Sequence, residues 1–151
     1  MTELRQYDPL EVVGTFVLNT GQTINILDGS ISPGDFVTTT KDNPRWAREF
    51  DRAGNTTRVK NNNRGGTVSV VLSASSPTNT ALSLVATQDD LTESRVGALL
   101  LKDLNGNTVV EADGAFIEDI PAPSFGSTRG SRTWVWQCAN LRPFVGGHSL
   151  A

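Results

Sequence analysis

The chain has 151 residues, of which 37% are hydrophobic, and a net charge of −3. This size suits one domain with one core, and the acidic balance argues against general affinity for nucleic acid or anionic membranes. The single cysteine, Cys138, excludes an intramolecular disulfide and a cysteine-based metal site. The polar first nine residues lack the apolar stretch of a secretory signal, and no apolar run reaches membrane length, so we expect neither export nor a membrane span.

Turn residues divide the first forty residues into three predicted strands. Strands at 10–18 and 23–27 flank the polar sequence 19–22, so we expect them to pair as an antiparallel hairpin. Glycine and proline after residue 27 then mark turns, and a third strand is predicted at 36–40.

The segment 41–65 differs in charge from the rest of the chain. It holds seven basic residues against three acidic ones, so its net charge is +4 and the remainder carries −7. Ala53-Gly54-Asn55 predicts a turn in its middle. We expect a projecting hairpin arm here, because so polar a segment has little apolar surface to bury. It either binds phosphate groups or contacts the acidic remainder of another copy, and the net charge favours the second.

The next elements are predicted to be a strand, a helix and a hairpin. Residues 66–73 have the apolar pattern of a buried strand. Ser76-Pro77, followed by apolar residues at three- and four-residue spacings, predicts an amphipathic helix at 77–92. Asn105-Gly106, between predicted strands at 97–104 and 107–112, predicts a type I′ turn.

Two further strands, at 115–120 and 131–140, are predicted on either side of a proline-rich break. The second places Trp134, Trp136 and Cys138 on one face, which favours a core position over an exposed platform for stacking sugars or bases. A loose tail is expected at about 145–151. The whole chain, 1–151, is therefore predicted to be a single mainly β domain, a β-sandwich or barrel with one flanking α-helix.

The sequence shows no pattern typical of a catalytic or metal site. The one histidine, His148, lies in a glycine-rich segment where an exposed side chain without a role is expected. Residues 103–107 lack the spacing and the closing glutamate of a calcium loop. Adjacent carboxylates such as Asp89 and Asp90 face different directions and do not form an acid–base pair. We therefore expect neither an enzyme nor a cofactor.

Six pieces of sequence, in one order, carry a resemblance to a known family. They are Tyr7-Asp8-Pro9; Gly66-Thr67-Val68-Ser69-Val70 with Leu72; Ser76-Pro77 with Asn79, Ala81 and Leu82; Leu101-Lys102-Asp103-Leu104-Asn105-Gly106 with Thr108; Trp134 with Cys138-Ala139; and Phe144-Val145-Gly146-Gly147. Together they resemble the tail-tube proteins of contractile-tailed bacteriophages over nearly the whole chain. The stretches 18–36 and 41–63 match less closely.

This resemblance implies a structural virion protein with a tail-tube-like fold, whose six-membered rings stack into the tube of a contractile tail. The implied partners are other copies of the chain, the tail sheath, tape-measure, baseplate and tail terminator proteins, and DNA that passes without specific binding. The implied location is a virion assembled in the host bacterial cytoplasm. Tubes of phage-derived bacteriocins and contractile secretion systems are similar in architecture. A carbohydrate-binding β-sandwich and a head-decoration or tail-completion protein are the alternatives.

Two groups of residues are candidates for contacts in such a tube. The arm is expected to contact the next ring through basic side chains that meet acidic groups and one aromatic side chain that packs on apolar surface: Arg45, Arg48, Arg58, Lys60 and Trp46. An acidic lumen would repel phosphate and let DNA slide, and its candidate residues are Glu111, Asp113 and Glu118.

Overall fold

The computed structural model describes residues 3–30 and 34–148, and within these ranges it contains nine β-strands and one α-helix. The elements in chain order are the 3₁₀ turn η1 (Pro9–Glu11), β1 (Val12–Leu18), β2 (Thr23–Asn25), β3 (Val37–Lys41), β4 (Trp46–Phe50), β5 (Thr56–Lys60), β6 (Gly66–Ser73), α1 (Thr78–Thr92), β7 (Gly97–Asp103), β8 (Val109–Ile117) and β9 (Ser131–Phe144). The mainly β fold with one flanking helix that the sequence predicts is confirmed.

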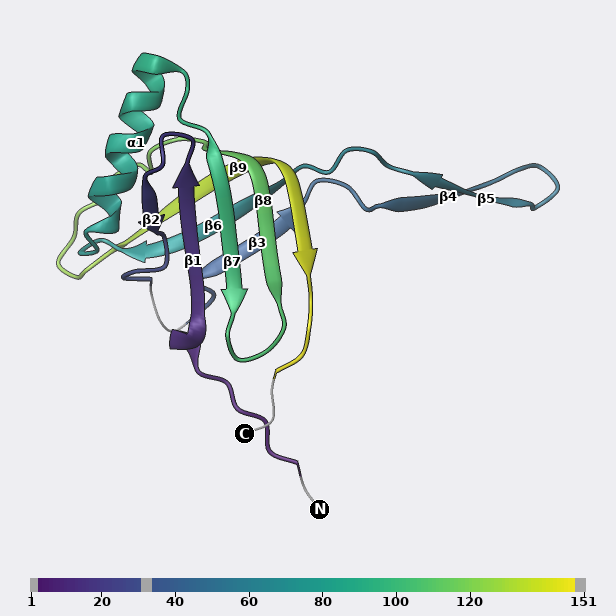
Figure 1. Ribbon diagram of the computed structural model, residues 1–151, viewed down its shortest axis with the longest axis horizontal. Coiled ribbons are helices and arrows are strands. Elements are labelled where there is room, and N and C mark those ends of the chain that lie inside the picture. Colours follow the sequence, from purple (N-terminus) through teal and green to yellow (C-terminus); the bar gives the residue numbers. More distant parts are fainter. Residues whose placement is uncertain (1–2, 31–33, 149–151) are drawn as a thin grey trace.

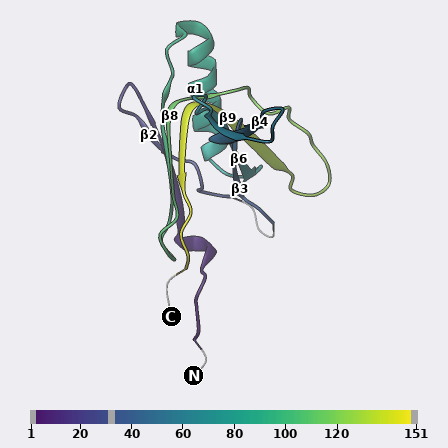
Figure 2. The same ribbon diagram turned by 90° about the vertical axis from the view of Figure 1, so that its right-hand side faces the viewer.

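Seven strands form one antiparallel sheet in the order β2-β1-β7-β8-β9-β6-β3, and β4 and β5 form a separate pair. The sheet folds over on itself into two layers because β9 is long enough to belong to both (Figures 1 and 2). Its residues from Ser131 to Cys138 pair with β6, and those from Trp136 to Phe144 pair with β8. One layer therefore contains β1, β7 and β8, and the other contains β6 and β3.

The core lies between these layers, where the alternation of each strand directs apolar side chains inward. In β6 the residues Val68, Val70 and Leu72 are fully buried, and in β9 both Trp134 and Trp136 are. Phe16 of β1 packs edge-on against Trp136 with ring centroids 5.8 Å apart. The tryptophans therefore belong to the core, as predicted, and are not exposed for stacking on a ligand.

Helix α1 lies beside β2 and covers one side of the sandwich (Figure 1). Ser76 Oγ accepts a hydrogen bond from the backbone N–H of Thr78 at 3.3 Å, which satisfies one of the free amides at the helix start. In the first turn of the helix, Asn79 Oδ1 accepts a hydrogen bond from the indole N–H of Trp134 at 2.9 Å. The helix therefore contributes the hydrogen-bond partner that a buried indole needs, in addition to its apolar face.

The structure corrects the predicted type I′ turn at Asn105-Gly106. Neither residue has positive φ, and five residues separate β7 from β8 instead of two. The Asn105 side chain accepts a hydrogen bond from the backbone N–H of Asp8 and donates to its carbonyl, at 2.8 and 2.9 Å. The loop is shaped by this contact with the N-terminal segment, which local turn preference does not reveal.

Two strand boundaries also differ from the prediction. The strands expected at 107–112 and 115–120 are one strand, β8, which passes through Gly114 at a φ of +60°. Strand β9 continues to Phe144 instead of ending at 140.

The segment expected to begin a loose tail contacts the loop between β7 and β8. Thr108 Oγ1 accepts a hydrogen bond from the Gly146 N–H at 3.0 Å, and His148 forms a bridge with Gly106. Residues 145–148 are thus held by contacts that the sequence did not indicate, and residues 149–151 lie outside the described part of the chain.

Candidate assembly surfaces

Strands β4 and β5 form an arm that extends away from the seven-stranded sheet (Figure 1). Every residue of both strands is exposed. The Asp51 carboxylate holds the tip of the arm by accepting three hydrogen bonds of at most 2.9 Å. The donors are the backbone N–H of Ala53 and the backbone and side-chain N–H groups of Asn55. The side-chain hydrogen bond from Asn55 and these backbone bonds lower the pKa of Asp51. An isolated two-stranded hairpin is marginally stable in water, so the arm is an element that gains from contact with another surface.

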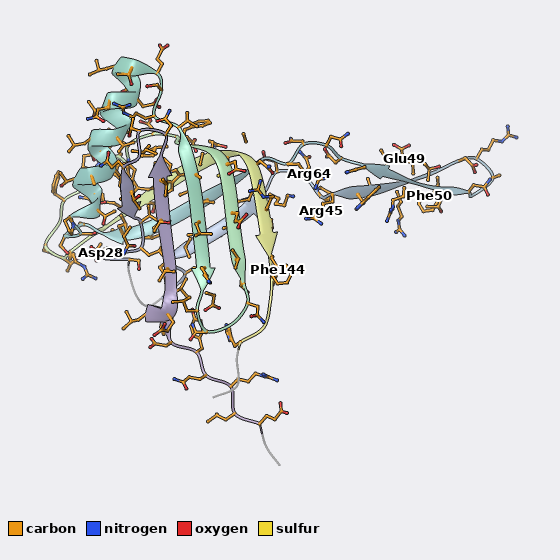
Figure 3. All side chains as sticks on the ribbon, in the orientation of Figure 1. Asp28, Arg45, Glu49, Phe50, Arg64 and Phe144 are labelled. Atoms are coloured by element: carbon orange, nitrogen blue, oxygen red, sulfur yellow. The ribbon has the colours of Figure 1, made fainter. Side chains whose placement is uncertain are left out.

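Strand register places the arm's cations and aromatics together on one face. Residues directly opposite each other in an antiparallel pair share a face, and Trp46 lies opposite Lys60, Arg48 opposite Arg58 and Phe50 opposite Thr56. Consecutive residues of a strand point to opposite sides, and Figure 3 shows Glu49 and Phe50 on opposite sides of the arm. We call the first side the basic face of the arm: Trp46, Arg48, Phe50, Thr56, Arg58 and Lys60.

Four of the five residues proposed for the inter-ring contact are thus on this basic face. The fifth, Arg45, comes directly before β4 and is exposed at the base of the arm (Figure 3). Register is the signal in the sequence that could have shown this grouping, since a turn at 53–55 fixes which residues face each other. Sequence reasoning missed Phe50, which is 63% exposed on the same face.

The basic face holds like charges close together. Arg48 and Arg58 are directly opposite each other, an arrangement of like charges that destabilises a strand pair. Cation–π contacts hold both guanidinium groups, with Arg58 3.7 Å from the Trp46 ring centroid and Arg48 5.5 Å from that of Phe50. Among the ion pairs of the described residues, none involves a basic residue of the arm. An anionic surface laid on this face would relieve the repulsion.

The three acidic residues proposed for the lumen occupy neighbouring positions on the outer side of the sandwich. Glu111 and Asp113 point outward from β8, and both contact Arg142 of β9, at 3.4 and 2.7 Å. The hydrogen bond to Asp113 and the neighbouring charges raise the pKa of Arg142. Glu118 follows β8 and accepts a hydrogen bond from Gln137 at 3.1 Å. The structure therefore places a cation, which the sequence did not predict, among the acidic side chains of this face.

The sheet has several open hydrogen-bonding edges: β2 and β3 are its terminal strands, and β9 and β1 are each paired along only part of one side. Beyond Cys138, β9 pairs with no strand but β8, and on its other side the Leu141 N–H donates a hydrogen bond to the Arg64 carbonyl at 2.8 Å; exposed Phe144 marks the open end of this edge in Figure 3. On the other side of the same layer, β2 pairs with β1 only from Thr15 to Val17, so the start of β1 has no strand beside it on that side. Unpaired edges of this kind can template pairing with another chain.

No group of three potential metal ligands is found within the described residues. His148 is exposed, as expected, but it has partners: its ring stacks on Tyr7 with centroids 4.9 Å apart, and Nε2 lies 3.3 Å from Asp103 Oδ2. In the described part of the chain, no helix is both long and apolar enough to cross a membrane.

The sequence matches no protein-family profile and no curated protein, but its structure is similar to several solved ones. A chain of the cap that terminates the tube of the anti-feeding prophage has a TM-score of 0.63 with this chain. The two share 9% sequence identity over 97% of this chain and 95% of that one. A chain of the PVC sheath–tube complex, an extracellular contractile injection system, has a TM-score of 0.62 with 12% identity over 93% of both chains.

The fold is that of contractile injection system proteins. A chain of the PVC sheath/tube terminator supports this with a TM-score of 0.62 and 12% identity over 93% of this chain and 97% of that chain. The resemblance to tail-tube proteins that the sequence carries is thus confirmed at the level of the fold, across nearly the full length of both chains.

Proposed function

We propose that this chain is a structural subunit of the tube of a contractile tail or injection system, and that it assembles with copies of itself into stacked six-membered rings. The observation that carries the proposal is the fold shared with chains of such systems over nearly their whole length. A solved baseplate structure that contains a similar chain, at a TM-score of 0.59 and 13% identity, is six-fold symmetrised.

The open strand edges support closure into a ring. The β1 edge and the edge of β9 beyond Cys138 lie on opposite sides of one layer. Copies that pair edge to edge would extend this layer from subunit to subunit, and a closed cylinder leaves no edge unpaired. In such a ring one face of the layer lines the lumen, where Glu111, Asp113 and Glu118 would repel the phosphates of passing DNA.

The arm supports the stacking of one ring on the next. It projects from one side of the subunit, where it can reach a different surface of another copy. Contacts of this heterologous kind produce open-ended stacks, whose length an additional protein must set. We infer that sheath, tape-measure, baseplate and terminator proteins are the partners of the assembled tube in a virion or particle built in the bacterial cytoplasm.

A tube terminator is the second candidate, because two of the similar structures are a terminating cap and a sheath/tube terminator. A terminator of this fold would form a ring that ends a stack. The two functions differ in whether the purified chain stacks upon itself.

Negative-stain electron microscopy of the purified protein at high concentration tests the proposal. We expect hollow cylinders of stacked rings, whereas single rings that do not stack would identify a terminator. A monodisperse monomer at every concentration would contradict both functions.

A pair of variants separates the arm's role from a general effect of charge. Arg58→Gln and Val59→Glu each lower the net charge by one, at adjacent residues on opposite faces of the arm. We expect Arg58→Gln to inhibit stacking and Val59→Glu to leave it nearly unchanged, as measured by light scattering. Equal effects of the two variants would show that the basic face has no specific role.

A further inference from the structure

The sandwich has an open end at which part of its core is uncovered. At this end β1 begins and β7 finishes, and the edge strand β3 faces them across a depression of about 160 Å³. Its walls include Val12, Val37, Leu101 and Val110. A second depression of about 440 Å³ shares Val12 and Val37 and continues past Tyr7. We call the two together the groove.

Among the described residues, no helix or strand covers the inner side of β3 at this end. Val37 and Thr39 point inward from this strand but are only half-buried, whereas Val68 and Val70, their partners on β6, are fully buried. Apolar surface that faces an open depression is stabilised by an apolar occupant. An engineered apolar cavity of about 150 Å³ binds benzene, so the groove has room for an aromatic ring.

Acidic residues border the groove. Asp35 and Asp103 line it, and Asp8 and Glu11 belong to the turn whose other residues form one of its walls. Lys102 is the only basic residue among the described residues that line it. Two carboxylates against one ammonium group therefore line the groove, with Asp103 also 3.3 Å from His148 Nε2, and this excess of acidic groups beside apolar side chains is complementary to the basic face of the arm with its two exposed aromatic rings.

The arm of one subunit is directed away from the groove of that same subunit. The groove is at the Val37 end of β3, and the arm leaves from the Lys41 end and continues outward (Figure 1). The complementary surfaces therefore belong together only between different copies. This geometry fits a head-to-tail contact, in which every copy uses its arm on one side and its groove on the other.

We propose that the groove receives the arm of another copy, with Trp46 or Phe50 inserted between β3 and β1–β7 and with Arg48 and Arg58 paired with the acidic rim. This inference rests on the proposed function, since it names the surface that receives the arm when rings stack. The occupant also covers the part of the core that the sandwich leaves open.

Photo-crosslinking in assembled material tests the contact directly. The variant Phe50→p-benzoylphenylalanine is assembled from an equal mixture of isotopically light and heavy protein, irradiated and digested for mass spectrometry. We expect crosslinks between light and heavy chains from position 50 to the groove segments 7–12, 35–39 and 101–103. The same photoreactive residue at Thr57, on the opposite face of the arm, is the matched control and should not label the groove.

A charge reversal in the groove provides a second measurement. We expect Asp35→Lys to raise the protein concentration needed for assembly about fivefold or more, corresponding to the loss of roughly 1 kcal/mol per contact. Asp90→Lys, at an exposed position on α1 outside the groove, should have little effect.

The outcomes distinguish this inference from the proposed function. Stacked rings whose crosslinks from position 50 map outside the groove would overturn the inference and leave the proposed function standing. Absence of rings and tubes from the unmodified protein would contradict the proposed function, and the inference with it.

Discussion

Truncation of Trp46 to alanine removes the largest apolar group of the arm. The residue is 42% exposed in the isolated subunit, and a tryptophan buries about 200 Å² when fully covered, so about 85 Å² is available for a partner to bury. At about 25 cal/mol per Å², burial of this surface in the proposed contact would contribute about 2 kcal/mol per subunit. We therefore expect Trp46→Ala to raise the critical concentration for assembly roughly 30-fold.

Sedimentation of assembled material over a range of total concentrations measures this change. Val59→Ala is the matched control, because Val59 is 39% exposed on the same arm but points to the opposite face. Neither residue belongs to the core, so both variants should unfold at the temperature of the unmodified subunit. An unchanged critical concentration for Trp46→Ala, or a larger effect of Val59→Ala, would refute the assignment of the basic face as a contact surface.

Three predictions concern the subunit itself, measured at concentrations below assembly. Asn79→Ala leaves the buried indole N–H of Trp134 without its partner and should lower the free energy of unfolding, measured in urea, by about 1–3 kcal/mol; an unchanged midpoint would contradict this. Gly97→Ala should destabilise the subunit by about 1–3 kcal/mol in the same assay, because its Cβ would meet the backbone carbonyl oxygen of Val17, whereas a neutral effect would show that β7 can shift freely. Burial raises the pKa of the Cys138 thiol to about 11, so the thiolate is scarce at pH 8. Reaction of Cys138 with a thiol reagent should therefore be at least about 100-fold slower than in the urea-unfolded chain. Rapid labelling of the folded subunit would contradict the burial of this thiol.

Strands whose residues alternate regularly could be predicted closely from the sequence. Strand β6 has the predicted bounds of 66–73, and α1 begins within one residue of the position indicated by Ser76-Pro77. In both cases the signal is local, because burial of one face imposes a period of two on a strand and about 3.6 on a helix.

Features that depend on distant parts of the chain could not be predicted in this way. Asn105 has the local preferences of a hairpin turn, but its side chain bonds to Asp8, 97 residues away. The candidate lumen residues were chosen for their charge, and only the register of β8 with β9 shows that Arg142 lies between Glu111 and Asp113.

The candidate assembly surfaces were predictable in part. The excess of basic residues in 41–65 predicted the arm, and the alternation of side chains along a strand determines which of them share a face. The groove could not be predicted, because it results from the incomplete cover of β3 by the opposite layer. Such a gap depends on how the whole sheet folds over, and no local pattern encodes it.

We propose that the subunit has surfaces that only other copies of the chain satisfy. Sedimentation velocity of the purified protein from micromolar to millimolar concentration tests this most directly. We predict a concentration-dependent change from monomer to rings and larger stacks that high salt weakens, because the arm's charges contribute to the contact. A single monomeric boundary over the whole range would contradict the account.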